Sequence, residues 1–155
     1  MKKANRIAVV GATGMVGKAF LSILEEKFFI NAEVDLLASK KSEGKKVTFR
    51  GSEHVIADLA EYDFSNTDLA LFSAGASVSA KFAPIAVSQG CLVVDNSSCF
   101  RYDADIPLIV PEVNGHNLND YDLPGIIANP NCSTIQMLVA LKLSLIHISE
   151  PTRPY

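Results

Sequence analysis

Cys132 is the residue of this chain best placed to do covalent chemistry. It stands in NPNCSTIQMLVA, residues 129–140, between a tight polar turn and an apolar run at helical spacing. The PN before it and the ST after it are residue types that cap and begin helices, so the thiol is predicted to lie in a first helical turn. There the helix dipole and unpaired backbone N–H groups favour the nucleophilic thiolate and could stabilise an oxyanion on a substrate. The alternative is a small buried apolar residue, the commoner role of an isolated cysteine.

A glycine-rich loop near the N-terminus could hold a nucleotide. Gly11, Gly14 and Gly17 in GATGMVG follow an apolar run at residues 7–10 and precede residues 15–28, where apolar side chains recur at helical steps. Such a strand–turn–helix lets the backbone approach a pyrophosphate, which the helix N-terminus attracts; a purely structural turn is the alternative. The loop residues assigned to the cofactor are Gly11, Thr13, Gly14, Met15 and Val16.

The end of the next predicted strand, residues 34–38, indicates which dinucleotide is bound. NAD sites usually carry an acid there, which holds the ribose 2′-hydroxyl. Here SKKSEGKK follows the strand, and the two nearby acids come too early in it. A lysine and two hydroxyls suit a 2′-phosphate, so Ser39, Lys41 and Ser42 favour NADP as the cofactor. The alternative is a solvated loop, because two more lysines continue the run of charge.

Apolar runs alternate with helical patterns along the chain. Strands are predicted at residues 7–10, 34–38, 47–49, 55–59, 69–72, 91–94 and 126–128, and helices at 15–28, 78–87 and about 133–142. This alternation predicts an α/β fold, a Rossmann-like, doubly wound and mostly parallel sheet. Polar stretches such as SAGAS, DNSS and NPNCST follow the strands, so we expect them to meet at the carboxyl edge of the sheet, where ligands bind. Ser73 and Gly75 of SAGAS therefore join the predicted cofactor site.

Composition and charge are those of a soluble globular domain. The net charge of the 155 residues is −3, so no global field favours nucleic acid or a membrane surface, and we expect neither as a partner. The cysteines have no metal-type spacing, so no metal site is expected. Free thiols, Cys91 in the core among them, suit a reducing, cytoplasmic location. The apolar run after MKKANR is too short for a signal peptide or a membrane span.

Five motifs, in this order, resemble the aspartate-semialdehyde dehydrogenase family: GATGMVG, SAGAS, DNSSCFR, PEVN and NPNCSTIQ. The resemblance spans roughly residues 5 to 142 and corresponds to the N-terminal part of that enzyme. N-acetyl-glutamyl-phosphate reductases and glyceraldehyde-3-phosphate dehydrogenases share the chemistry. Each has a different motif around its cysteine, so both fit worse.

The resemblance implies a reaction and roles for three residues. Family members use NADPH to reduce 4-phospho-aspartate to aspartate 4-semialdehyde and phosphate, a step towards lysine, threonine and methionine, and they act as homo-oligomers. By similarity, Cys132 attacks the acyl phosphate and forms a thioester. Arg101 binds the phosphate, and Asn131 is a polar neighbour of the same phosphate. Without the motif, Arg101 would be interpreted as an exposed loop arginine.

The resemblance also implies how the chain is organised. Residues 1–131 form the NADP-binding domain, and residues 132–142 open a substrate and dimerisation domain. Residues 143–155 resemble nothing in the family and are interpreted as a non-native tail. The family's glutamine, substrate-binding arginine and histidine base belong to the second domain, and the three histidines of this chain match none of them. We therefore expect the 155 residues alone to be inactive. The alternative is a stand-alone nucleotide-binding or sensor module, which would have no use for a thiol at a helix start.

Overall fold

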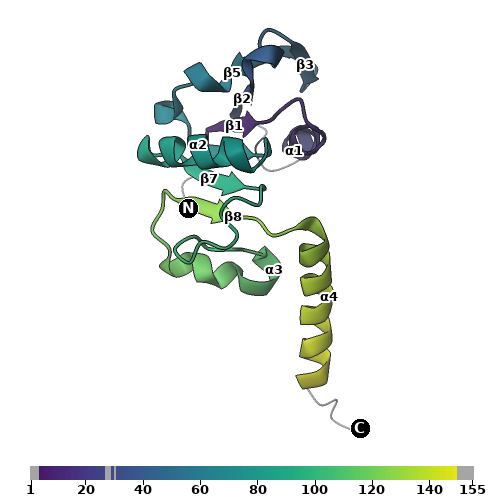
Figure 1. Cartoon of the computed structure of the whole chain (residues 1–155). Helices are drawn as coiled ribbons and strands as arrows, with labels where there is room; N and C mark the ends of the chain where they lie inside the picture. The colour runs from purple at the N-terminus through teal and green to yellow at the C-terminus, as the bar shows by residue number, and fades with distance from the viewer. Residues whose placement is uncertain (1–3, 27–28, 30, 150–155) are drawn as a thin grey trace.

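A six-stranded parallel sheet forms the centre of the computed structural model, which describes residues 4–26, 29 and 31–149 (Figure 1). The strand order is β5-β2-β1-β6-β7-β8. The strands are β1 (Arg6–Val10), β2 (Glu33–Ala38), β5 (Ala57–Asp58), β6 (Leu69–Phe72), β7 (Leu92–Asp95) and β8 (Ile126–Ala128). The order reverses between β1 and β6, as in doubly wound dinucleotide-binding folds. The prediction of a Rossmann-like α/β sheet is therefore confirmed.

Helices and a small hairpin complete the architecture. The helices are α1 (Met15–Glu26), α2 (Ala76–Ser88), α3 (Pro111–Asn114) and α4 (Cys132–Ser149), and the antiparallel hairpin is β3 (Lys46–Phe49) with β4 (Ser52–Val55). Among the described residues, four short 3-10 helices lie in the connections: η1 (Lys40–Ser42), η2 (Leu59–Glu61), η3 (Phe64–Asn66) and η4 (Gly115–Asp120). Helix α2 packs against β6, β7 and β8, and α1 packs against β1.

Strand β1 is buried on both faces of the sheet, which explains why it is a continuous apolar run, whereas in β6 and β7 buried residues alternate with half-buried ones. Successive side chains of a strand point to opposite faces. In β1, Ala8 and Val10 join the buried cluster beside α2, while Ile7 and Val9 join the cluster beside α1 and the hairpin. All four side chains are fully buried. This double burial holds β1 at the centre of the sheet, and so fixes the position of the loop that follows it.

Residues 55–59 do not form the single strand that the sequence predicts. Val55 ends the hairpin and is exposed, whereas Ile56 is buried. The backbone of Ile56 bonds to both Gly44 and Lys45, which turns the chain from the hairpin into the parallel sheet. After β5, the carboxylate of Asp58 accepts a hydrogen bond from the backbone of Ala60 and starts η2.

Helix α4 is longer than predicted, because it continues from Cys132 to Ser149. Residues 143–149 contain neither glycine nor proline, so nothing in the backbone stops the helix at residue 142. Figure 1 shows α4 extending away from the sheet, and Lys142 Nζ ties it to the carbonyl of Val113 in α3 at 2.9 Å.

Some predictions fall on residues that the structure does not describe. Phe28, predicted to be helical, and residues 150–155 lie outside the described residues. The interpretation of 143–155 as a non-native tail stays a prediction. No helix in the described part of the chain is long and apolar enough to cross a membrane.

Candidate active site

The polar stretches that follow the strands meet at the carboxyl edge of the sheet, as expected. The residue just after each of four strands donates its backbone N–H to a carbonyl at the end of a neighbouring strand. The donor and acceptor pairs are Gly11 and Leu37, Ser73 and Val10, Asn96 and Phe72, and Asn129 and Asp95, at 2.8–2.9 Å. The loops after β1, β6, β7 and β8 are thus held at one edge of the sheet.

The glycine loop is packed too tightly for side chains. Gly11 has φ +91°, and a Cβ there would lie 2.9 Å from Ser73 Oγ and 3.0 Å from the backbone nitrogen of Ala74. A Cβ on Gly17 would overlap the carbonyl oxygen of Gly11. Glycine therefore lets α1 begin directly behind the end of β1, and the backbone of the loop faces the open edge of the sheet.

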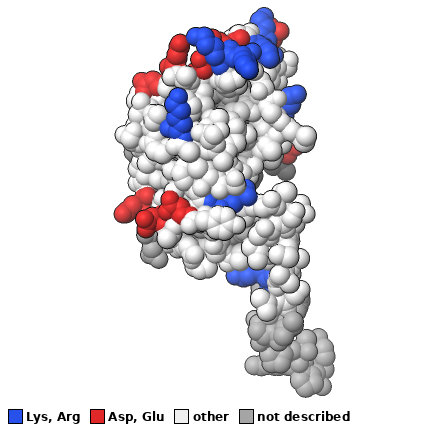
Figure 2. Space-filling view, in the orientation of Figure 1, with Lys and Arg blue, Asp and Glu red and all other residues white. Residues whose placement is uncertain are grey.

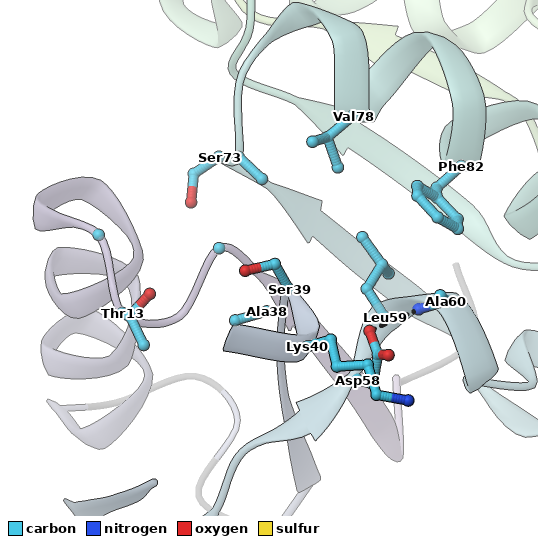
Figure 3. A pocket seen from close by; sticks show the side chains of 13 residues that line it. Thr13, Ala38, Ser39, Lys40, Asp58, Leu59, Ala60, Ser73, Val78 and Phe82 are labelled. Carbon is cyan, nitrogen blue, oxygen red and sulfur yellow. Dashed lines mark hydrogen bonds between the residues drawn. The ribbon is translucent and has the colours of Figure 1, made fainter. Parts of the chain in front are cut away.

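A pocket of about 640 Å³ opens beside this loop (Figure 3). This volume lies within the range of small-molecule sites. Its walls come from the glycine loop, the end of β2, the β5–η2 junction and the start of α2. The lining residues are Gly11, Thr13, Gly14, Ala38, Ser39, Lys40, Asp58, Leu59, Ala60, Ser73, Ala74, Val78 and Phe82. A chain with this fold and a pocket at the reversal of strand order is arranged to bind a dinucleotide.

The pocket contains only part of the predicted cofactor site. Gly11, Thr13, Gly14, Ser39 and Ser73 line it, whereas Met15, Val16, Lys41, Ser42 and Gly75 do not. Met15 and Val16 begin α1 and are exposed, the first of them to 88%. Gly75 is the N-cap of α2 and is also exposed. Contact of these residues with a cofactor stays a prediction.

Lys40, rather than Lys41, is the lysine at the pocket wall. The 3-10 turn of η1 separates the two side chains around its axis, and the sequence alone cannot tell which of them faces inward. Lys40 Nζ lies 3.8 Å from the carboxylate of Glu61, and both side chains are exposed. Within the described part of the chain Lys41 forms no ion pair, so its charge is available to an anion. Figure 2 shows lysine and arginine side chains gathered with acidic ones around the hairpin end of the molecule.

Sequence reasoning missed the far wall of the pocket. Asp58 and Leu59 belong to the region misassigned as one strand, and Val78 and Phe82 belong to a helix interpreted only as a packing element. Val78 and Phe82 are four positions apart, and residues at this spacing share one face of a helix. This spacing could have indicated that both face the same site.

Arg101 joins the loops after β7 and β8. Its Nε donates to the carbonyl of Asn129 at 3.0 Å, and its Nη2 donates to the carbonyl of Asn96 at 3.1 Å. The side-chain amide of Asn129 donates to the side-chain oxygen of Asn96, which closes the link between the two loops. Among the described residues, Nη1 of Arg101 has no hydrogen-bond partner, so the guanidinium keeps donors for an anion.

Helix α4 begins at Cys132, close to the predicted start, and Asn131 is the residue just before it. The side-chain oxygen of Asn131 accepts a hydrogen bond from the backbone of Ser133 at 2.9 Å and caps the helix. Cys132 is the first residue of the helix and is exposed, and its Sγ lies 3.8 Å from Asn131 Oδ1. An accessible thiol thus stands at the helix start, on the loop that Arg101 holds.

A buried carboxylate organises the loop that carries Arg101. Asp95 at the end of β7 is fully buried, and it accepts hydrogen bonds from the Ser79 hydroxyl at 2.7 Å and from the Ser97 hydroxyl at 2.6 Å. The Ser97 hydroxyl oxygen in turn accepts the backbone N–H of Cys99. These bonds fix the DNSS turn, and therefore the position from which Arg101 reaches the neighbouring loop.

The other two cysteines are poor nucleophiles. Cys91 is buried in the core, as predicted, and burial raises the pKa of its thiol to about 12, with the Asp68 carboxylate adding to the shift. The pKa of Cys99 is also raised, first by burial and then by the Asp95 carboxylate. Only the thiolate is reactive, so both shifts lower reactivity near neutral pH.

Cys132 should therefore be the first thiol to react with iodoacetamide near neutral pH. Its side chain is exposed at a helix start, whereas Cys91 is buried and the pKa values of the Cys91 and Cys99 thiols are raised by burial and by nearby carboxylates. Peptide mass spectrometry after brief labelling measures the order. The denatured chain is the control, since its three thiols should be labelled alike. Labelling of Cys132 no faster than that of Cys99 in the folded chain would contradict the expectation.

Comparison with known proteins assigns this fold and site to a class. The sequence profile described as semialdehyde dehydrogenase, NAD binding domain, matches residues 6–121, and the chain belongs to this family. The resemblance found in the motifs is thereby confirmed.

Relatives and solved structures agree with this assignment. The chain is 58% identical over 142 residues to the aspartate-semialdehyde dehydrogenase of Legionella pneumophila, covering 92% of this chain and 41% of that protein. It is 54% identical to the Aquifex aeolicus enzyme, covering 88% of this chain and 41% of that protein. The crystal structure of aspartate semialdehyde dehydrogenase II from Vibrio cholerae complexed with ASA superposes with a TM-score of 0.85 at 52% identity, covering 91% of this chain and 46% of that chain. The Candida albicans enzyme with NADP gives a TM-score of 0.77 at 27% identity, covering 92% and 47%. The chain thus spans about two-fifths of the length of the curated relatives it matches.

Proposed function

We propose that this chain supplies the NADP-binding part and the nucleophile of an aspartate-semialdehyde dehydrogenase, which reduces 4-phospho-aspartate to aspartate 4-semialdehyde. The observation that carries the proposal is the exposed Cys132 thiol at the start of α4, on a loop tied to Arg101 and at the same sheet edge as the dinucleotide-sized pocket. A pure nucleotide-binding module needs the pocket but not the thiol.

The pocket residues fit a dinucleotide. Gly11 and Gly14 leave the backbone bare beside the start of α1, where a pyrophosphate is stabilised by the helix N-terminus. Ser39 and Lys40 line the end of β2, with Lys41 beside them, and suit a 2′-phosphate. When bound, the reduced cofactor supplies the hydride that converts an acyl group to an aldehyde.

The chain's own residues provide covalent catalysis and phosphate binding. The Cys132 sulfur attacks the acyl carbon of the substrate, a C–S bond forms, and phosphate leaves with the electron pair of the C–O bond. Nη1 of Arg101 donates hydrogen bonds to the phosphate, while its other nitrogens keep the two loops together. The backbone N–H groups at the start of α4 stabilise the oxyanion that forms on the carbonyl. On reduction of the thioester, the C–S bond breaks and returns the Cys132 thiolate.

The activity requires more than these 155 residues. A general base typically contributes about 10²–10⁴-fold, and substrate positioning contributes about 7–11 kcal/mol to lowering the barrier. The family residues for both roles belong to its second domain, and His116 of this chain is an exposed residue of η4.

The test compares the chain with a graft of residues 1–142 onto the C-terminal part of a related enzyme. The assay is phosphate-dependent formation of NADPH from aspartate semialdehyde. We expect activity in the graft and none in the chain alone. Robust activity of the chain alone, or an inactive but folded graft, would refute the proposal.

NADPH should bind this chain more tightly than NADH, with a preference that shrinks as salt rises, because it depends on the charges of Lys40 and Lys41. Replacing both lysines by alanine should reduce the preference about tenfold, which corresponds to about 1.4 kcal/mol. Titration of each cofactor by fluorescence measures both affinities. Lys45→Ala removes an exposed charge from the same loop, outside the pocket lining, and serves as the matched control. Equal affinity of the unaltered chain for NADPH and NADH would show the 2′-phosphate assignment to be wrong.

A further inference from the structure

We propose that Asp58 recognises the base of the bound dinucleotide by accepting a hydrogen bond from the exocyclic amine of adenine. This inference rests on the dinucleotide site of the proposed function and names the residue that would select the base. It depends on the order of the strands, on the walls of the pocket and on the hydrogen bonds of Asp58.

The strand order leads from the glycine loop to Asp58. Strands β1, β2 and β5 are successive neighbours in the sheet, and Ala38 at the end of β2 pairs with Asp58 at the end of β5. Neighbouring strands lie about 4.8 Å apart, so Asp58 lies roughly 10 Å along the sheet edge from the end of β1. A pyrophosphate at the glycine loop and a ribose at Ser39 and Lys40 therefore leave the base over β5.

The walls at this end of the pocket suit a flat aromatic ring. Leu59 and Ala60 come from η2, and Val78 and Phe82 come from one face of α2. In Figure 3, Val78 and Phe82 face Leu59 across the cavity, while Ser39 and Thr13 lie towards the glycine loop. Apolar walls with few polar groups are typical of sites that bind a purine by its faces and recognise it at its edge.

Asp58 is the polar group at this apolar end. The residue is only 7% exposed, and its Oδ1 accepts the backbone N–H of Ala60 at 3.1 Å. Within the described part of the chain, Oδ2 has no hydrogen-bond partner. No buried side-chain nitrogen or oxygen in that part of the chain lacks a partner, so Oδ2 is open to solvent, and a ligand that brings a donor can take the place of water there. A 2′-phosphate would be repelled by the carboxylate, which argues that Asp58 faces the base rather than the phosphorylated ribose.

The chemistry of the carboxylate predicts which base is accepted. A carboxylate can only accept hydrogen bonds, and the C6 amine of adenine donates them. Hypoxanthine carries an oxygen at the same position, which would face the carboxylate as a second acceptor. Sites built around such a bond discriminate strongly against an analogue that cannot form it.

The test is calorimetric titration of the whole 155-residue chain with NADPH and with its hypoxanthine analogue. We expect the adenine form to bind about tenfold more tightly. In Asp58→Asn, the amide oxygen can keep the bond to Ala60 while the amide nitrogen becomes a donor towards the base. The preference should then vanish or turn towards hypoxanthine. Asp63→Asn is the matched control, because Asp63 caps η3 in the same way through Ser65, is exposed and lies outside the pocket lining.

Three results would overturn the inference. They are equal binding of the two bases by the unaltered chain, an equal loss for both bases in Asp58→Asn, and no binding of either form. An equal loss is what a purely structural cap or a contact with the ribose would give. If the chain binds both bases equally and the graft is active, only the role of Asp58 is rejected and the proposed dehydrogenase stands. Base-selective binding with an inactive, folded graft rejects the proposed dehydrogenase and leaves Asp58 as the residue that recognises the base.

Discussion

Replacing Cys132 by alanine in the graft should lower kcat for phosphate-dependent NADPH formation by on the order of 10⁴-fold or more. The thiolate forms the covalent bond that divides the reaction into two steps, and no neighbouring side chain replaces it: Asn131 and Ser133 beside it are a neutral amide and a hydroxyl. Cys132→Ser should lose nearly as much, because a hydroxyl is far less acidic than a thiol and an alkoxide is a poorer leaving group than a thiolate. The assay follows the absorbance of NADPH in the graft and in each variant.

The matched control for this loss is Cys99→Ala. Cys99 lies in the loop after β7 at the same sheet edge, and its raised pKa disfavours the thiolate. Its replacement should leave the rate unchanged. The affinity of Cys132→Ala for NADPH should equal that of the parent, which separates chemistry from cofactor binding. Near-parental turnover by Cys132→Ala would remove the nucleophile from the mechanism, whereas a loss shared by Cys99→Ala would indicate damage to the fold.

The central part of the fold could be predicted because its signals are local. Residues 7–10 and 69–72 are apolar without alternation, as is typical of inner strands of a parallel sheet, and both form such strands. The glycine pattern predicted the close turn at Gly11, and the residues around Cys132 predicted a helix start. In each case neighbours in sequence determine the structure, so no knowledge of distant contacts is needed.

The far side of the pocket could not be predicted, because it depends on contacts between distant segments. Asp58 lines the pocket through the pairing of β5 with β2. Phe82 lines it from α2, a separate segment of the chain. The choice between Lys40 and Lys41 depends on a single 3-10 turn. The length of α4 was underestimated for another reason: the apolar spacing fades after residue 142, but a helix without a breaking residue continues.

Replacing Arg101 by alanine should lower kcat/KM of the graft for phosphate by about 100-fold or more, the usual scale for removing a charged group from a partly buried pair. Two effects combine. The phosphate loses the donors of Nη1, and the loops after β7 and β8 lose the bonds from Nε and Nη2 to Asn129 and Asn96. Arg101→Lys keeps the charge, but an ammonium cannot hold both carbonyls and a phosphate in one plane. We expect it to recover part of the loss and to remain about tenfold below the parent.

Initial rates at varied phosphate measure the effect. The fall in kcat/KM should come mainly from a higher KM for phosphate. Tyr102→Ala is the matched control, because Tyr102 is the next residue of the same loop and its side chain is fully exposed. That variant should behave as the parent. If Arg101→Ala changed kcat while KM for phosphate stayed constant, the guanidinium would act only by holding the two loops. If Arg101→Ala and Tyr102→Ala had the same KM for phosphate, Arg101 would have no role in phosphate binding. Loss of a side chain that binds phosphate must raise this KM, whereas loss of its exposed neighbour should not.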